Sequence, residues 1–242
     1  MVGAGILLNH LSLDLVYANS DAKAASVDRS IVAANTNFAI GLLKELQSEQ
    51  TGRNIFISPL SVSIALAMAY NGANSSTREA MGRALGLEGM GEDAVNVGYQ
   101  QLIESLLSAD RDVSLNIGDS VWIRSTFAPS VNAEFTDALS KYFGSSIYSR
   151  PFDASTVDEV NSWVSKETNG KIDRILENID SQNVMFLINA IYFKGGWVDE
   201  FDAALTQRAD FTTAAGSTIK VDMMRREGSY AYFGDESVRV VR

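Results

Sequence analysis

An unusually apolar segment at residues 184–193, with the sequence VMFLINAIYF, restricts the fold of this chain more than any other feature. Apolar side chains occupy both the odd and the even positions of the segment. Because alternate residues of a strand point to opposite faces, this pattern predicts a strand that is covered on both sides. We therefore expect residues 184–193 to form a central strand of a sheet with other elements packed over both of its faces.

One polar residue lies within this segment. Asn189 shares its face of the strand with apolar residues, namely Met185, Leu187, Ile191 and Phe193. A buried amide without hydrogen-bond partners costs about 1–3 kcal/mol, so partners are expected. Ser58 and Ser61 are the candidates because they begin the most apolar helix of the chain. On polarity alone, the simpler interpretation is a satisfied structural network.

Helical periodicity dominates the first part of the chain. The expected helices cover 36–50, 59–69, about 77–85, about 92–109, 131–141 and 155–169. Pro59 suits the first turn of the second helix, whose apolar side chains surround it almost completely and predict burial. In the helix over 92–109 we expect the inward side chains to be Leu102, Ile103, Leu106 and Leu107.

Strand-like patterns become frequent after residue 110. The expected strands cover a short run at 54–57, then 113–123, 146–149, 184–193, 206–212, 218–224, 229–233 and 237–242. Since helices come first and most strands later, the fold class is α+β. No internal repeat or interdomain linker divides residues 35–242, so we expect them to belong to one domain.

Composition argues against several classes of function. The chain has 30 acidic and 20 basic residues and a formal net charge of −10, which does not fit a nucleic-acid-binding surface. It has no cysteine, and its one histidine is His10. A thiolate nucleophile, a Ser-His-Asp triad and a histidine-based metal site are therefore not expected within this chain. We predict that the protein is not an enzyme and needs no cofactor.

Residues 1–34 form an N-terminal extension with two interpretations. Small residues near Ala22 and Ala24 resemble a signal-peptide cleavage site. However, no basic residue precedes the apolar stretch, and Asn9, His10 and Asp14 interrupt it. We favour an extension whose apolar residues between Ile6 and Val16 pack on the domain. No apolar run reaches the roughly 18 residues of a membrane span, so we expect no membrane partner.

Four segments in order along the chain resemble the serpin family. They are residues 54–73, NIFISPLSVSIALAMAYNGA; residues 161–172, NSWVSKETNGKI; residues 187–197, LINAIYFKGGW; and residues 221–224, VDMM. The resemblance extends from about residue 36 to residue 242. It implies the serpin fold, in which helices pack around a large central mixed or antiparallel sheet.

The resemblance also implies a function and site residues. Serpins offer a reactive loop to a protease as a suicide substrate, and the cleaved loop inserts into the main sheet. Ser58, Ser61 and Asn189 match the shutter, the polar cluster beneath the place where the sheet opens. Trp197 matches the breach, where the loop first enters, although from the residues alone it is equally well a packed aromatic side chain. Positions near the breach are matched by Lys194, Gly195, Thr206, Phe211 and Met224.

The partners follow from the same resemblance. The main expectation is a target protease of the serine class, with the cysteine class second, and an extracellular rather than cytoplasmic location. The alternative is a noninhibitory serpin that acts as a chaperone or carrier. The family's reactive loop and last core strands lie beyond Arg242, and the alternating pattern of 237–242 continues to the last residue. A complementary C-terminal segment is therefore expected, and protease specificity cannot be read from these residues.

Overall fold

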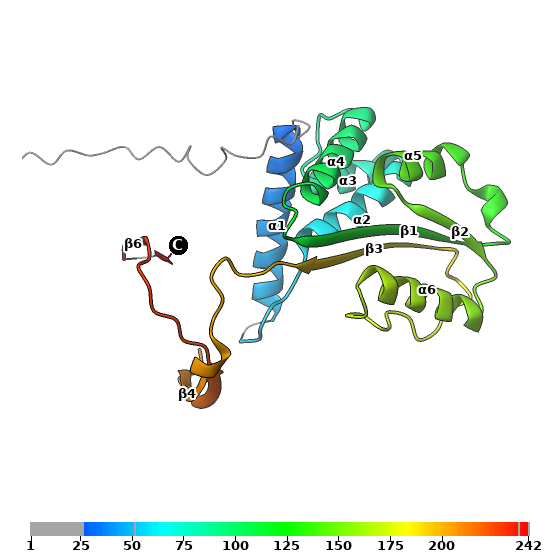
Figure 1. The fold of residues 1–242 in the computed structure, drawn as a ribbon. Helices are drawn as coiled ribbons and strands as arrows, with labels where there is room; N and C mark the ends of the chain where they lie inside the picture. The colour runs from blue at the N-terminus through cyan, green and yellow to red at the C-terminus, as the bar shows by residue number, and fades with distance from the viewer. Residues whose placement is uncertain (1–26, 51, 237, 242) are drawn as a thin grey trace, which may run out of the picture.

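The computed structural model describes residues 27–50, 52–236 and 238–241. Helices α1 to α5 lie on one side of the main sheet and α6 lies on the other, as Figure 1 shows. The predicted packing of the apolar residues between Ile6 and Val16 lies outside the described residues. The mixture of helices and sheets agrees with the predicted α+β class.

The first helix, α1, covers Arg29–Glu49 and begins seven residues earlier than the predicted start at residue 36. Asp28 caps it, with its carboxylate accepting a hydrogen bond from the Ser30 backbone N–H at 2.8 Å. Ile31 is fully buried and Ala34 nearly so. The predicted start was wrong because the apolar face continues about two turns further toward the N-terminus than the main run of leucines indicated.

The next helices are α2 (Pro59–Gly72), α3 (Ser75–Leu85) and α4 (Glu92–Leu107). Gly86 ends α3 in the left-handed conformation with φ of 69°, directly after the predicted end of the helix at residue 85. The short strand expected at 54–57 is absent because this segment pairs with no strand in the described chain, and Phe56 is fully exposed. Ile103 of α4 points inward as predicted, but Leu107 is exposed at the last turn.

Helix α5 covers Ala133–Phe143 and α6 covers Ala154–Glu167. Asp153 caps α6 by accepting hydrogen bonds from the backbone N–H groups of Ser155 and Thr156 at 3.0 and 3.2 Å. The buried residues of α6 include Val157, Val160 and Val164, which form one apolar face of the helix. The observed bounds of α6 lie within two residues of the predicted range 155–169.

The main sheet has three strands in the order β2-β1-β3. Their bounds are Ser114–Arg124 for β1, Ser146–Arg150 for β2 and Met185–Lys194 for β3. β1 runs parallel to β2 and antiparallel to β3, with Asp119 opposite Asn189. Within the described chain β1 is the central strand and β3 lies at the edge, so the predicted central place of residues 184–193 stays a prediction. Their coverage on both faces is confirmed, since α2 and α6 both contact β3.

The last part of the chain forms two hairpins. Two short turns of 3-10 helix occur elsewhere, one before α5 and one before β4. The strands are β4 (Gln207–Thr212) with β5 (Thr218–Met223), and β6 (Tyr232–Gly234) with β7 (Arg239–Val241). The 3-10 turns cover Ala128–Ser130 and Ala203–Leu205. In Figure 1 both hairpins extend away from the main sheet and the helices.

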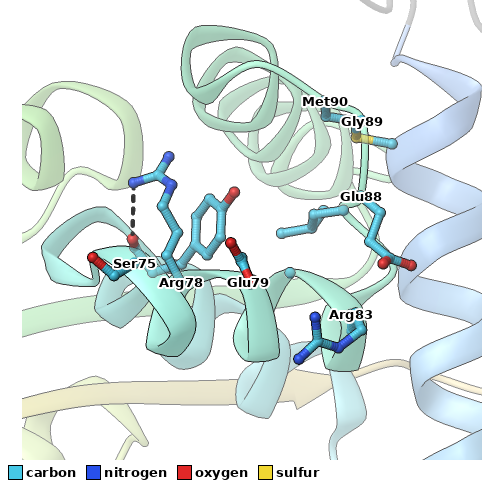
Figure 2. Close-up of a pocket in the computed structure, with 10 residues that line it drawn as sticks. Ser75, Arg78, Glu79, Arg83, Glu88, Gly89 and Met90 are labelled. Atoms are coloured by element: carbon cyan, nitrogen blue, oxygen red, sulfur yellow. Dashed lines mark hydrogen bonds between the residues drawn. The ribbon is translucent and has the colours of Figure 1, made fainter.

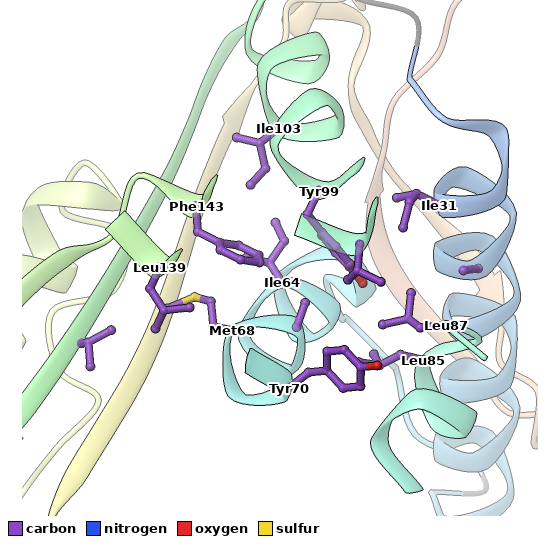
Figure 3. Packing of buried hydrophobic residues seen from close by; sticks show 14 of the residues in the cluster. Ile31, Ile64, Met68, Tyr70, Leu85, Leu87, Tyr99, Ile103, Leu139 and Phe143 are labelled. Atoms are coloured by element: carbon purple, nitrogen blue, oxygen red, sulfur yellow. The ribbon is translucent and has the colours of Figure 1, made fainter. Parts of the chain in front are cut away.

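The core lies between the helices α1 to α5 and one face of the sheet. Figure 3 shows Tyr99 and Phe143 meeting above α2, with ring centroids 5.9 Å apart. Met68, Ile64 and Leu139 fill the space between α2, α5 and the strands. A smaller cluster under α6 contains Trp122, Phe152 and Val160 on the opposite face of the sheet. The two clusters together hold both faces of the sheet away from water.

Candidate functional site

A polar junction joins two strands and one helix inside the core. We use this name for Ser61 of α2, Asp119 of β1 and Asn189 of β3. The Ser61 hydroxyl donates a hydrogen bond to the side-chain oxygen of Asn189. The Asn189 amide nitrogen in turn donates to the Asp119 carboxylate at 2.9 Å. Asn189 therefore uses both ends of its amide to connect α2 to the pair β1 and β3.

Ser58 lies next to the junction without contacting Asn189. It is the N-cap of α2, and its hydroxyl accepts a hydrogen bond from the Ser61 backbone N–H at 3.4 Å. The side chain of Ser58 is exposed. Of the two predicted serine partners, Ser61 is thus the direct partner of Asn189, whereas Ser58 positions Ser61 through the helix terminus.

Asp119 is the junction residue that sequence reasoning missed. Its relative exposure is 4%, and it shares its face of β1 with the core residues Val121 and Ile123. Burial raises the pKa of the Asp119 carboxyl from 3.8 to about 7, against a smaller lowering by the hydrogen bond from Asn189. A signal was available, because in the alternating strand 113–123 this position falls on the apolar face.

The opposite face of β1 receives the C-terminal end of α6. The side-chain amide of Asn116 donates to both the backbone oxygen and the carboxylate of Glu167, each at 2.8 Å. Gly118 allows this close approach, since a Cβ there would lie 2.9 Å from Cγ of Glu167. The helix across the sheet is thus attached to β1 by polar contacts, directly behind the polar junction.

Asn161 holds the chain that follows α6. Its side-chain oxygen accepts hydrogen bonds from the backbone N–H groups of Ile175 and Leu176 at 2.8 and 3.0 Å. Its amide nitrogen donates to the Leu176 carbonyl at 2.8 Å. Three hydrogen bonds anchor this segment to α6, and the burial of Asn161 protects them from competing water.

The residues assigned to the breach do not form a cluster in this structure. Lys194 is the last residue of β3, Gly195 and Trp197 follow it, and the Trp197 ring meets Phe201 edge-on at 5.8 Å. Trp197 is 69% exposed. Thr206, Phe211 and Met224 lie on or beside the hairpin β4-β5, where Phe211 and Met224 are exposed. Their proposed role beside the loop entry stays a prediction.

A separate cavity of about 510 Å³ lies between α3 and the loop that leads to α4 (Figure 2). Arg78 crosses it, forming an ion pair with Glu92 at 2.9 Å and donating to the Tyr70 carbonyl at 3.4 Å. Its guanidinium also stacks 4.2 Å from the centre of the Tyr70 ring. The Arg78 side chain is thus fully engaged by the protein itself, far along α2 from the polar junction.

Two further observations concern the part of the chain that the structure covers. Within residues 27–50, 52–236 and 238–241, no group of three or more histidine, cysteine, aspartate or glutamate side chains is arranged to hold a metal ion. No helix in these ranges combines the length and the apolar character that crossing a membrane requires.

A family model described as Serpin (serine protease inhibitor) matches residues 33–242. This chain belongs to the serpin family. The predicted resemblance is therefore confirmed, and the family as described comprises inhibitors of proteases rather than enzymes. The match begins within α1 and includes the polar junction, α6 and both hairpins.

Individual serpins support the same assignment. Serpin A9 of Mus musculus is 33% identical over 210 residues, which cover 85% of this chain and 50% of that protein. Corticosteroid-binding globulin of Pongo abelii is 31% identical over 214 residues, covering 87% of this chain and 52% of that protein. The chain thus spans about half the length of these relatives.

Solved structures confirm the predicted serpin fold. The thermophilic serpin tengpin in its latent state has a TM-score of 0.76 and 31% identity, with 89% of this chain and 57% of that chain covered. In its native state the TM-score is 0.75, with 89% of this chain and 54% of that chain covered. By TM-score, this chain is therefore about equally similar to the latent and the native state of tengpin.

Proposed function

We propose that the protein containing this chain inhibits a serine protease as a suicide substrate, by cleavage of a reactive loop and its insertion into the main sheet beside β3. The observation that carries the proposal is the polar junction. Asn189 connects β3 to β1 and α2 through two side-chain hydrogen bonds, so a displacement of β3 must break or exchange them. In this proposal the junction has a second arrangement after insertion, which gives the two states that a metastable inhibitor requires.

The edge of the sheet also supports this proposal. In the described chain β3 pairs with β1 and with no strand on its other side. A strand edge offers unpaired backbone N–H and C=O groups to an incoming segment, which is the chemistry of strand addition. The similar likeness to latent and native tengpin supports a fold of this part of the chain that is common to both states.

The predicted site residues take these roles within the proposal. Ser61 and Asn189 form the shutter, Asp119 completes it, and Ser58 sets the first turn of α2. The breach group begins at the last residue of β3 and extends to the β4-β5 hairpin and the residue after it; it comprises Trp197, Lys194, Gly195, Thr206, Phe211 and Met224. An extracellular location belongs to the same proposal and is supported by a relative named plasma serine protease inhibitor, 32% identical, from Mus musculus.

The test is to express the complete reading frame that contains residues 1–242 and to incubate the product with a panel of serine and cysteine proteases. An inhibitor should form a covalent complex that survives boiling in detergent, because the acyl-enzyme is trapped before hydrolysis. A protease whose nucleophile has been replaced by alanine is the control and should form none. Cleavage of the product by every protease without a stable complex would reject the inhibitory function.

The alternative is a noninhibitory carrier, and the likeness to corticosteroid-binding globulin supports it. The two functions differ in the hinge of the reactive loop. Small residues there permit insertion, whereas bulky, charged or proline residues obstruct it. Translation of the complete reading frame therefore separates the two functions before any assay, and thermal stabilisation after loop cleavage confirms insertion directly.

A further inference from the structure

Two crossings of the chain meet at one end of β1. The chain leaves the sheet after β2, at Pro151, to form α6, and it returns at Asn183, just before β3. Arg124, the last residue of β1, holds both crossings with one guanidinium group. It donates to the carbonyl oxygens of Pro151 at 3.5 Å, Asp180 at 3.1 Å and Asn183 at 2.8 Å. Because these donors share one rigid plane, the two crossings are fixed to each other as well as to β1.

Phe152, between the first crossing and α6, has a strained backbone. Its φ is 61°, in the left-handed region, which disfavours a residue other than glycine by a factor of about five to thirty. The buried ring stacks on Phe186 with centroids 5.1 Å apart, and the Arg124 guanidinium lies 5.0 Å from its centre. We use the name joint for Arg124, Phe152 and Phe186. Strained backbone persists only where the surroundings hold it, and it clusters at clamps and switch regions.

The segment between the two crossings is tied to itself. We call residues 151–183 the α6 unit. Among the helices of the described chain, α6 alone lies on its side of the sheet (Figure 1). Asn161 of α6 binds the backbone of Ile175 and Leu176, and the Thr168 hydroxyl accepts a hydrogen bond from the Ile172 backbone N–H at 3.1 Å. The helix and its return segment should therefore move together.

The end of the α6 unit far from the joint has fewer polar contacts with the sheet. There the side-chain amide of Asn116 donates to the backbone oxygen and the carboxylate of Glu167, and we call this pair the catch. The end near the joint has, besides the Arg124 contacts, an ion pair between Arg150 of β2 and Glu159 at 2.5 Å. Between the two ends, an apolar cluster around Trp122 keeps the unit closed most of the time.

We propose that the α6 unit is a lid on the sheet, which opens at the catch and turns about the joint. When the catch is released, the C-terminal end of α6 and the return segment leave β1 first. Arg124 keeps the two crossings together, and the backbone of Phe152 relaxes to an ordinary φ. Opening uncovers the sheet side chains around Trp122 as a minor state. All the contacts of the lid lie within residues 116–186, and none of them requires the proposed inhibition of a protease.

The first experiment measures hydrogen exchange of backbone amides in the complete protein. Asn116→Ala releases the catch alone, so protection of the amides in 164–168 should fall about tenfold. The amides in 157–160, close to the joint, should keep their protection within about twofold. The amides of β1 should also keep theirs, which separates lid opening from a loss of global stability. Unchanged protection in 164–168, or an equal loss in both halves of α6, would overturn the lid.

Arg124→Lys tests the joint in the same experiment. Lysine keeps the positive charge but has no planar fork for three carbonyl oxygens, so protection should fall in both halves of α6. Ser162→Ala, at an exposed position of α6, is the control and should behave as the wild type. Protection lost only in 164–168 of Arg124→Lys would place the hinge elsewhere and reject the joint.

A second measurement tests the strain at the joint through urea unfolding midpoints. Phe152→Gly and Phe152→Ala both remove the ring, so their difference reports the backbone. At a φ of 61° glycine should be the more stable of the two, by about five- to thirtyfold in the unfolding equilibrium. Ser162→Gly and Ser162→Ala, within the helix, should show the opposite order. A higher midpoint for Phe152→Ala would refute the strained joint. Neither measurement needs a protease, so a failed inhibition assay would reject the proposed function alone.

Discussion

At the scale of single residues, the side-chain amide of Asn189 combines a donor and an acceptor in one group. Its oxygen accepts from Ser61 and its nitrogen donates to Asp119. A serine would be too short to reach both partners, and an aspartate has no donor when ionised. The apolar face of Asn189 made its contact with Ser61 predictable, but the contact with Asp119 was missed. Ser58, the other predicted partner, caps α2 and does not contact Asn189.

Replacing Asn189 by alanine should destabilise the protein and loosen the sheet. Asn189→Ala leaves Ser61 and the buried Asp119 without their partner, which should cost about 1–3 kcal/mol. The urea midpoint should fall, and in the complete protein conversion to a latent or polymeric form on heating should be faster. Asn178→Ala, at an exposed position, is the control. A wild-type conversion rate in Asn189→Ala would contradict the shutter role.

At the scale of elements, the contact of α1 with α4 depends on a glycine. Gly98 of α4 lies against Ile31 of α1, and a Cβ at position 98 would lie 2.4 Å from Cγ1 of Ile31. Ile31 is fully buried, so it has little room to move. This contact also explains why α1 extends back to Arg29, because its first turn supplies Ile31 to the core.

Gly98→Ala should therefore destabilise the fold although alanine favours helices. Overpacking costs about 1–3 kcal/mol, which exceeds the roughly 0.5–1 kcal/mol that alanine gains over glycine within a helix. Gly41→Ala in α1 is the matched control, because nothing lies within 4 Å of its added Cβ. Urea unfolding should show a lower midpoint for Gly98→Ala and a higher one for Gly41→Ala. Equal stabilisation by both would contradict the α1–α4 packing.

At the scale of the whole molecule, the outer edge of β3 is open in the described chain. An open edge on an apolar strand is a template for pairing with another chain. Residues 1–242 expressed alone should consequently self-associate or capture a complementary strand peptide, and should form no covalent complex with a serine protease. Sedimentation over a dilution series measures the association.

A charge at the end of the open edge provides the control. Phe193 is 68% exposed at the C-terminal end of β3, so Phe193→Lys adds a charge without removing a core side chain. Charged edge residues oppose strand pairing, and the variant should associate more weakly. A monomeric wild-type fragment at every concentration would show that the edge is covered in solution.

The sequence alone determined those features that depend on periodicity and on local chemistry. Helix caps, the glycine that ends α3, the α+β class and the burial of α2 follow from interactions within a few residues. Tertiary structure decided what depends on partners far along the chain. Within the described residues, β1 pairs on both sides, residues 54–57 pair with no strand, and Asp119 contacts Asn189 across 70 residues. Strand order and the pKa of a buried carboxyl arise from long-range neighbours, which periodicity does not encode.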